Sequence, residues 1–322
     1  MEQGEGSCHA ALPDRSGGTL RSTREWIVAR RDRKADRLGS DRGAGIYAAP
    51  RGEASWPPLA LLRALLLAVW HDLSDVKLAE ALDDRASFRR FCGFARSEPT
   101  PEPTPERTAF VRFRRALVRH GLDAALFEAI TAQLKRRAVR VKTGTLVDAT
   151  VVASASEGDD EARWSGHRSR KAIHGYKAHV GADADTALVE RVAVTPGNAH
   201  DGRSGEAALP DEPGHVYAAS AYRGEVFASA VRARGGTPRV VATGVWAGAD
   251  PEAQARAERW LADWNGAIHR VRCRIEKIFG TWKRSYGFRR MRWRGIAKAR
   301  LQAHLTAIAY NLRRTLNILN PA

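Results

Sequence analysis

The stretch TGTLVDATVVAS, residues 143–154, decides the fold class of this chain. β-branched and other apolar residues fill it, and Gly144 and Ser154 bound it, which is typical of a strand. Four further segments of this kind follow it. They are YKAHVGAD (176–183), ALVERVAVTP (187–196), HVYAAS (215–220) and PRVVATG (238–244).

The connections between these strands indicate how they are arranged. Asp183 to Thr186 form a hairpin-like link between the second and third strands. A helix over 224–236 separates the fourth strand from the fifth, and a long helix runs from about Glu252 to Arg284. Strands followed by alternating helix and strand predict an α/β domain with a mixed five-stranded sheet over residues 139–322.

Residues 46–138, in contrast, predict an all-helical module. LALLRALLLAVW (59–70) is apolar at helical spacing, and Ser74 is placed to cap the next helix. The Pro-rich spacer SEPTPEPTPE (97–106) cannot hold an ordinary helix, and further helices follow it. Residues 1–45 have little apolar periodicity and are expected to be poorly ordered and basic.

The charge balance points to a polyanionic partner. Fifty-three Lys and Arg against 36 Asp and Glu give a net charge of +17. A membrane is the weaker choice, because the most apolar run contains Arg63 and is shorter than the ~20 residues of a span. Three scattered cysteines suggest neither a disulfide framework nor a zinc site, which predicts a reducing, cytoplasmic location. The expected polyanionic partner is therefore nucleic acid.

Two acids are candidates for chemistry. Asp148 lies in the middle of the first strand, where a carboxylate is costly to bury unless it is paired or bound to metal. A hydrogen-bonded structural role is equally compatible with that position. On the long helix His269, Arg272, Glu276 and Lys283 fall within about 60° of one another. Glu276 either forms routine salt bridges or holds a metal while Arg272 and Lys283 hold phosphates, and the shared face favours the second.

The surroundings of Glu276 are strongly basic. Residues 267–300 contain twelve Lys or Arg and a single acid. The segment SYGFRRMRWRGIAKAR (285–300) interleaves Tyr286, Phe288 and Trp293 with these cations, a composition suited to gripping a nucleic-acid backbone and stacking on bases. A solvated basic face is the alternative. The candidate DNA-binding residues are Arg272, Lys283, Lys171, Lys177, Arg289, Arg290 and Arg292.

These motifs resemble those of a known family. The spacing of His269, Arg272, Glu276 and Lys283 resembles the Tyr-x2-Arg-x3-Glu-x6-Lys motif of DDE-type insertion-sequence transposases, with His in place of Tyr. Together with GTLVDAT, RKAIHGYKAHV and TPGNAHD, it indicates the insertion sequence 5 group of the insertion sequence 4-like superfamily. The resemblance covers residues 46–318.

The resemblance implies a ribonuclease H-like core with three acids that bind two divalent metals, Mg²⁺ or Mn²⁺. Its first acid corresponds to Asp148 and its third to Glu276. Its second ends the fourth strand in a VYAD-S-AY pattern, and this chain has Ala219 there. Strand transfer needs two metals about 4 Å apart, so the loss weakens the site. Neither Asp201 nor Asp211 matches the missing position.

The expected function is therefore a DNA transposase. It would bind terminal inverted repeats and target DNA, as a homodimer on paired ends, in the nucleoid of the cytoplasm. Its cleavage and strand transfer would be impaired. One alternative is a non-catalytic DNA-binding relic or repressor of transposition, and another is a related nuclease acting on branched DNA or RNA.

Overall fold

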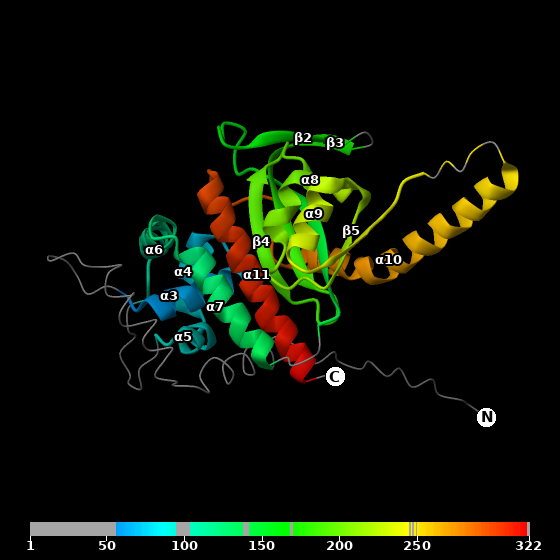
Figure 1. The fold of residues 1–322 in the computed structure, drawn as a ribbon. Helices are drawn as coiled ribbons and strands as arrows, with labels where there is room; N and C mark the ends of the chain where they lie inside the picture. The colour runs from blue at the N-terminus through cyan, green and yellow to red at the C-terminus, as the bar shows by residue number, and fades with distance from the viewer. Residues whose placement is uncertain are drawn as a thin grey trace, which may run out of the picture.

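The computed structural model describes residues 56–94, 104–137, 142–167, 170–244 and 250–320, together with positions 246 and 248. A mixed sheet lies between helices, and the N-terminal helices pack beside it (Figure 1). Residues 1–45, which the sequence predicts to be poorly ordered, lie outside the described residues.

The described part of the N-terminal segment is helical, as predicted. Its helices are α3 (Pro58–Trp70), α4 (Asp75–Asp84), α5 (Ala86–Cys92), α6 (Arg107–Arg119) and α7 (Leu122–Arg137). The apolar residues of α3 are buried almost continuously. Ser74 caps α4 as expected, because its hydroxyl accepts a hydrogen bond of 3.3 Å from the Lys77 amide. Most of the Pro-rich spacer is not described, and its last residues lead into α6.

The sheet is built around a central strand that carries Asp148. Its strands are β1 (Gly144–Ala153), β2 (Arg163–His167), β3 (Arg170–Asp183), β4 (Val189–Pro196), β5 (His215–Ala218) and β6 (Thr237–Val240). The order is β2-β3-β1-β5-β6, and β4 also pairs with β3. β3 is antiparallel to β1, β2 and β4, whereas β1, β5 and β6 are parallel to one another. The sheet is therefore mixed, as predicted.

The predicted number of strands was wrong: the sheet has six strands rather than five. The additional strand β2 has the sequence RWSGH, in which Trp164 is the one large apolar residue, so no apolar alternation reveals it. Its partner β3 begins at Arg170, before the predicted start at Tyr176. The hairpin between β3 and β4 is confirmed, with the Ala187 amide donating to the Asp183 carbonyl at 2.9 Å.

Helices cover both faces of the sheet. One face packs against η2 (Gly205–Ala208), η3 (Ser220–Tyr222) and α9 (Glu225–Ala233), which follow the short helix α8 (Asp201–Ser204). The other packs against α10 (Pro251–Ser285) and α11 (Ile296–Leu319). Each face carries a cluster of buried apolar residues. Val147 belongs to the cluster under α9 and Leu146 to the cluster under α10 and α11, because successive residues of a strand point to opposite faces. Among the described residues no helix is long and apolar enough to cross a membrane.

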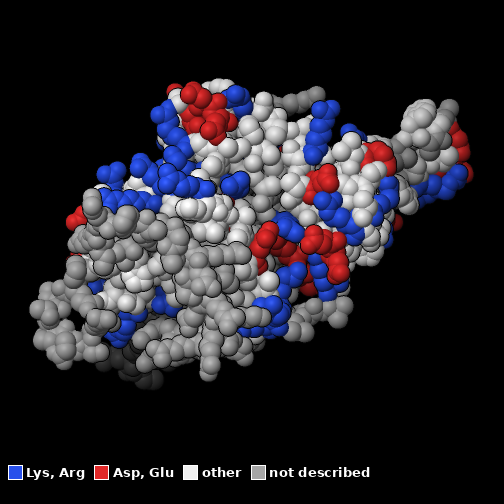
Figure 2. All heavy atoms as spheres, turned by 60° about the vertical axis from the view of Figure 1, so that its left-hand side comes forward, with Lys and Arg blue, Asp and Glu red and all other residues white. Residues whose placement is uncertain are grey.

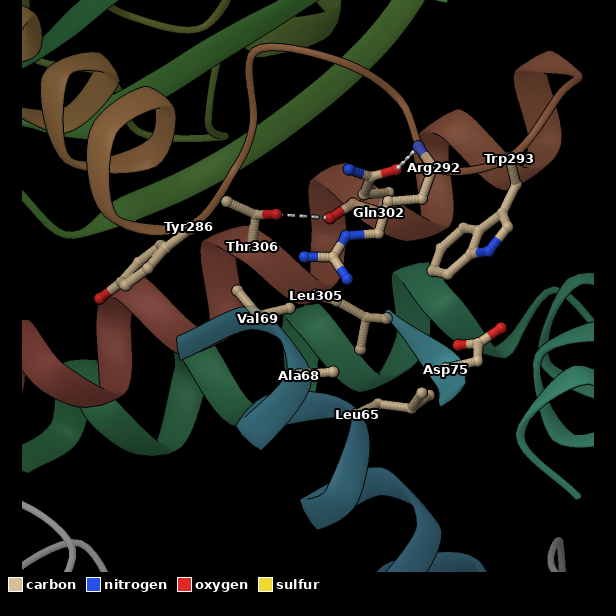
Figure 3. A pocket seen from close by; sticks show the side chains of 10 residues that line it. All are labelled: Leu65, Ala68, Val69, Asp75, Tyr286, Arg292, Trp293, Gln302, Leu305 and Thr306. Atoms are coloured by element: carbon tan, nitrogen blue, oxygen red, sulfur yellow. Dashed lines mark hydrogen bonds between the residues drawn. The ribbon is translucent and has the colours of Figure 1, made fainter. Parts of the chain in front are cut away.

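The N-terminal helices pack against α11 and against the segment between α10 and α11. A cavity of about 20 Å³ lies at this junction, lined by residues of α3 and α11 together with Arg292 and Trp293 (Figure 3). The Arg114 guanidinium lies 4.2 Å from the ring centroid of Trp293 and pairs with Asp75 at 2.6 Å. The cavity has room for about one water molecule, so it is part of the packing rather than a substrate site.

Candidate active site

The parallel pairing of β1 with β5 brings Ala219 next to Asp148. The last register pair of these strands is Val147 with Ala218, and the next residues along the two chains are Asp148 and Ala219. Ala219 keeps an extended backbone, with φ −71° and ψ 166°, before the chain turns into η3. Ala219 therefore lies beside Asp148 at the ends of two neighbouring parallel strands.

Helix α10 crosses β1 and carries two charged side chains to the same place. The guanidinium of Arg272 donates one hydrogen bond to Asp148 Oδ2 at 2.6 Å and another to Glu276 Oε1 at 3.3 Å. The side chains of Asp148 and Arg272 are 16% and 14% exposed, whereas that of Glu276 is 64% exposed. The two predicted acids thus meet through an arginine that binds both.

Asp148 is held in an environment that opposes its charge. Burial raises the pKa of Asp148, while the Arg272 guanidinium and the Ala149 amide, at 2.9 Å, act in the opposite direction. The net result is a pKa above the usual value of an aspartate. Arg272 is therefore the main group that keeps this buried carboxylate ionised.

Tyr222, which the sequence did not single out as a candidate, lies close enough to this site to feel the charges of Asp148 and Arg272. Its side chain is buried, and neither its hydroxyl nor Arg272 Nε has a hydrogen-bond partner within the part of the chain that the structure describes. Burial raises the pKa of Tyr222, and the charges of Asp148 and Asp201 raise it further. Tyr222 corresponds to the final Tyr of the VYAD-S-AY pattern, but that pattern does not predict that the residue is buried.

Comparison with known proteins assigns this arrangement to a family. Residues 140–312, more than half of the chain, match the family model described as Transposase DDE domain. Residues 35–116 match a second model, described as Transposase domain (DUF772). The chain belongs to the DDE transposase family. No solved structure matches the chain.

DDE transposase domains generally use divalent metal ions, and the residues of this one can be compared with that requirement. Within the described ranges, no three or more His, Cys, Asp or Glu side chains gather closely enough to hold an ion. The site has two carboxylates, and the guanidinium of Arg272 already binds both. A cation would have to displace Arg272, so this donor set does not fit two metal ions.

The nearby acids of the transposase are bound elsewhere. Asp201 pairs with Lys177 at 2.8 Å. Lys177 is the register partner of Val151, so its side chain points to the opposite face of the sheet from that of Asp148. Asp211 pairs with Arg191 at 3.2 Å. Both carboxylates are thus paired with cations other than Arg272.

The chain returns to the end of β1 after α10 and brings basic residues with it. Arg290 forms a bridge with Ala153, and the Met291 amide donates to the Ala153 carbonyl at 2.7 Å. Arg289 and Arg290 are exposed at this strand end, and Arg289 Nε donates to the Lys283 carbonyl at 3.2 Å. Arg289 and Arg290, two of the predicted DNA-binding residues, thus lie together at the C-terminal end of β1, beyond Asp148.

The other predicted basic residues lie apart from this group. Lys171 is exposed on β3, whereas Lys177 is largely buried in its ion pair. Arg292 is largely buried as well, where it pairs with Asp72 at 2.5 Å and donates to the Leu73 carbonyl. Figure 2 shows Lys and Arg in several patches separated by groups of Asp and Glu, so the basic surplus is not spread evenly.

The predicted aromatic contacts to bases are wrong for two residues. Tyr286 and Phe288 are buried, and Phe288 packs edge-on against Trp282 at 5.3 Å. Trp293 lies against Arg114 at the junction with the N-terminal helices. Composition alone does not reveal that the chain turns back into the core immediately after α10.

Proposed function

We propose that this transposase binds the terminal inverted repeats of an insertion sequence of the insertion sequence 5 group and is impaired in DNA cleavage and strand transfer. One observation carries the proposal: Ala219 stands next to Asp148, and Arg272 pairs with both remaining acids. A DDE site that lacks one carboxylate cannot place two cations for the attacking and leaving oxygens. Mg²⁺ or Mn²⁺ would bind here weakly.

DNA binding does not require the missing acid. Arg289 and Arg290 are exposed at the end of β1, and Lys171 is exposed on β3. Cations of this kind neutralise phosphates independently of a bound metal. The proposed protein therefore retains its affinity for element ends and target DNA while its chemistry is lost.

We assign different roles to the helical N-terminal part and to the sheet domain of the chain. Residues 46–138 would contribute to the recognition of end DNA, residues 139–322 would form the ribonuclease H-like catalytic domain, and two copies would act on paired ends. The order of strands and helices around β1 supports the ribonuclease H-like assignment.

A second candidate function is a repressor that occupies element ends without cutting them. The Arg272 ion pairs favour it, because they neutralise the two remaining acids without a metal. The repressor and the impaired transposase differ in whether restoring one carboxylate is sufficient to restore chemistry.

The experiment compares three proteins on a plasmid that carries the gene and its flanking DNA. The wild type should bind the flanking ends but cut them barely, and Ala219→Asp should cut them with Mn²⁺. Ala221→Asp is the matched control, because it adds the same carboxylate at an exposed position two residues further along. Equal cleavage by the two variants, above the level of the wild type, would contradict the proposal, whereas binding without cleavage by Ala219→Asp would favour the repressor.

A further inference from the structure

The N-terminal half of α10 extends away from the body of the molecule (Figure 1). The helix begins with a well-formed cap, in which the Asp250 carboxylate accepts hydrogen bonds from the Glu252 and Ala253 amides at 3.0 and 3.2 Å. Its buried residues, however, begin only at Ile268. The sequence therefore specifies a helix start well before the helix reaches its core.

One apolar stripe continues along the whole helix. In the C-terminal half it is buried against the sheet and consists of Ile268, Ile275, Ile278 and Trp282. At 100° per residue the same stripe continues toward the N-terminus through Ala253, Ala257, Trp260 and Trp264. There Trp260 is 55% exposed, and its ring stacks on that of Trp264 with centroids 5.7 Å apart. The face that forms core in one half is uncovered in the other.

Two residues, Trp264 and Asn265, bind α10 to the end of β6 and the residues that follow it. Trp264 Nε1 donates to the Val240 carbonyl at 3.0 Å, and the Asn265 side chain pairs with the backbone of Ala242 at 2.9 and 3.0 Å. Residues 251–263 thus project by about 20 Å at 1.5 Å per residue. A helix of that length is marginal in water without a packing partner.

The charge of the projecting part excludes DNA as the best partner. Positions 250–266 carry four acids and two arginines, a net charge of −2 in a chain of +17. The acids are Asp250, Glu252, Glu258 and Asp263, and the arginines are Arg256 and Arg259. DNA phosphates would be repelled, whereas a mixed-charge rim around an apolar stripe suits another protein surface.

We infer that this face binds the same face of a second copy, with the two α10 helices antiparallel about a twofold axis near Trp260. Arg256 and Asp263 lie on the same flank of the stripe, seven residues apart. If the axis passes between Arg259 and Trp260, Arg256 of each copy faces Asp263 of the other. The contact is self-complementary, as a twofold interface requires.

Within one chain these charges are poorly satisfied. Arg256 reaches Asp250 and Glu252 only at 3.8 and 3.6 Å, through exposed side chains. Exchange of partners across the axis therefore costs little. The inference deepens the proposed action on paired ends and rests on that proposal for its biological role, but the contact itself does not depend on DNA.

The test is the self-association of the full-length protein without DNA, measured by analytical ultracentrifugation over a range of concentrations. The wild type should form a dimer. Trp260→Glu should weaken it at least about a hundredfold, because a central tryptophan is the usual anchor of an interface. Thermal unfolding should be nearly unchanged in this variant, since Trp260 is 55% exposed and lies outside the buried clusters of the described residues.

Charge reversal provides the sharper test. Arg256→Asp and Asp263→Arg should each weaken the dimer roughly tenfold, and the double variant should restore it, because both cross-axis pairs are re-formed with opposite sign. Glu258→Arg, on the opposite side of the helix, is the matched control and should have little effect. A monomeric wild type, a dimeric Trp260→Glu protein or a double variant weaker than both single variants would overturn the inference.

Binding of flanking DNA by the same proteins separates this inference from the proposed function. Trp260→Glu should still bind a DNA fragment with one element end. If the wild type forms a dimer but binds no DNA, the proposed function fails and the interface stands. If Trp260→Glu loses DNA binding while the dimer persists, the helix face belongs to DNA and the inference is overturned.

Discussion

Asp148 on β1 and Arg272 on α10 form an ion pair of 2.6 Å across 124 residues of sequence. The pair joins the central strand to the helix that carries Glu276. It also balances a carboxylate whose burial opposes its charge. The same arginine therefore contributes to stability and engages both of the acids for which we propose a role in metal binding.

Arg272→Gln should lower the free energy of unfolding by about 3 kcal/mol at pH 7, because it leaves a buried carboxylate without its counter-charge. The pKa of Asp148 is already raised in the folded state, so the contribution of this group to stability falls as the pH rises through that range. Without Arg272 the pKa of Asp148 rises further, so the loss of stability of the variant relative to the wild type should be smaller at pH 4. Urea unfolding of the variant and the wild type at pH 7 and pH 4 measures this difference in the free energy of unfolding. A double variant with Asp148→Asn should lose less than the single one, and equal losses would contradict this account.

His179 should make the fold sensitive to mild acid. Burial lowers the pKa of His179 to about 4, and its Nε2 lies 2.9 Å from Thr195 Oγ1. The unfolded chain takes up a proton below about pH 6.5 and the folded chain only near pH 4, so stability is lost as the pH falls between these values. The loss should approach roughly 3 kcal/mol at pH 4. His179→Gln should show a flatter pH profile of unfolding, and an unchanged profile would refute the assignment.

Arg289 and Lys171 should contribute to the salt dependence of DNA binding. Each phosphate contact adds roughly −0.9 to the slope of log affinity against log salt concentration. Arg289→Ala and Lys171→Ala should each flatten the slope by about that amount. Arg232→Ala is the control, because this exposed arginine pairs with Glu225 on α9 at 2.7 Å. Slopes that match the control in both variants would mean that these cations form only a solvated face.

Arg292 should affect stability more than DNA binding. Its guanidinium pairs with Asp72 and donates to the Leu73 carbonyl at the junction shown in Figure 3. Arg292→Ala should destabilise the protein by about 2 kcal/mol, since hydrogen bonds to a charged group are lost in a partly buried place. Thermal unfolding and the salt slope of DNA binding measure the two effects separately. Normal stability with a flattened slope would instead make Arg292 a DNA contact.

The sequence predicted those elements in which one pattern dominates. β1 is rich in β-branched and apolar residues, and α10 keeps its apolar stripe from end to end, so both were found with nearly correct bounds. β2 was missed because a short, polar edge strand is specified by its partner rather than by its own residues.

The site was predictable only in part for a similar reason. A helical wheel placed Arg272 and Glu276 on one face, but it could not show that the guanidinium would reach Asp148. That contact depends on where α10 crosses the sheet. The roles of Tyr222 and Arg292 likewise depend on tertiary packing, because each acts through residues far away in the sequence.

Restoration of the missing carboxylate tests the central claim most directly. The measurement is nicking and strand transfer on DNA that carries the ends flanking the gene, with Mg²⁺ or Mn²⁺, for the wild type, Ala219→Asp, and Ala219→Asp combined with Glu276→Gln. The account predicts a rise of about a thousandfold in Ala219→Asp, since a mispositioned metal costs several kcal/mol and each 1.36 kcal/mol is tenfold in rate. The rise should vanish in the combined variant. Robust cleavage by the wild type, abolished by Asp148→Asn, would contradict the account, because the site would then be complete without an acid at position 219.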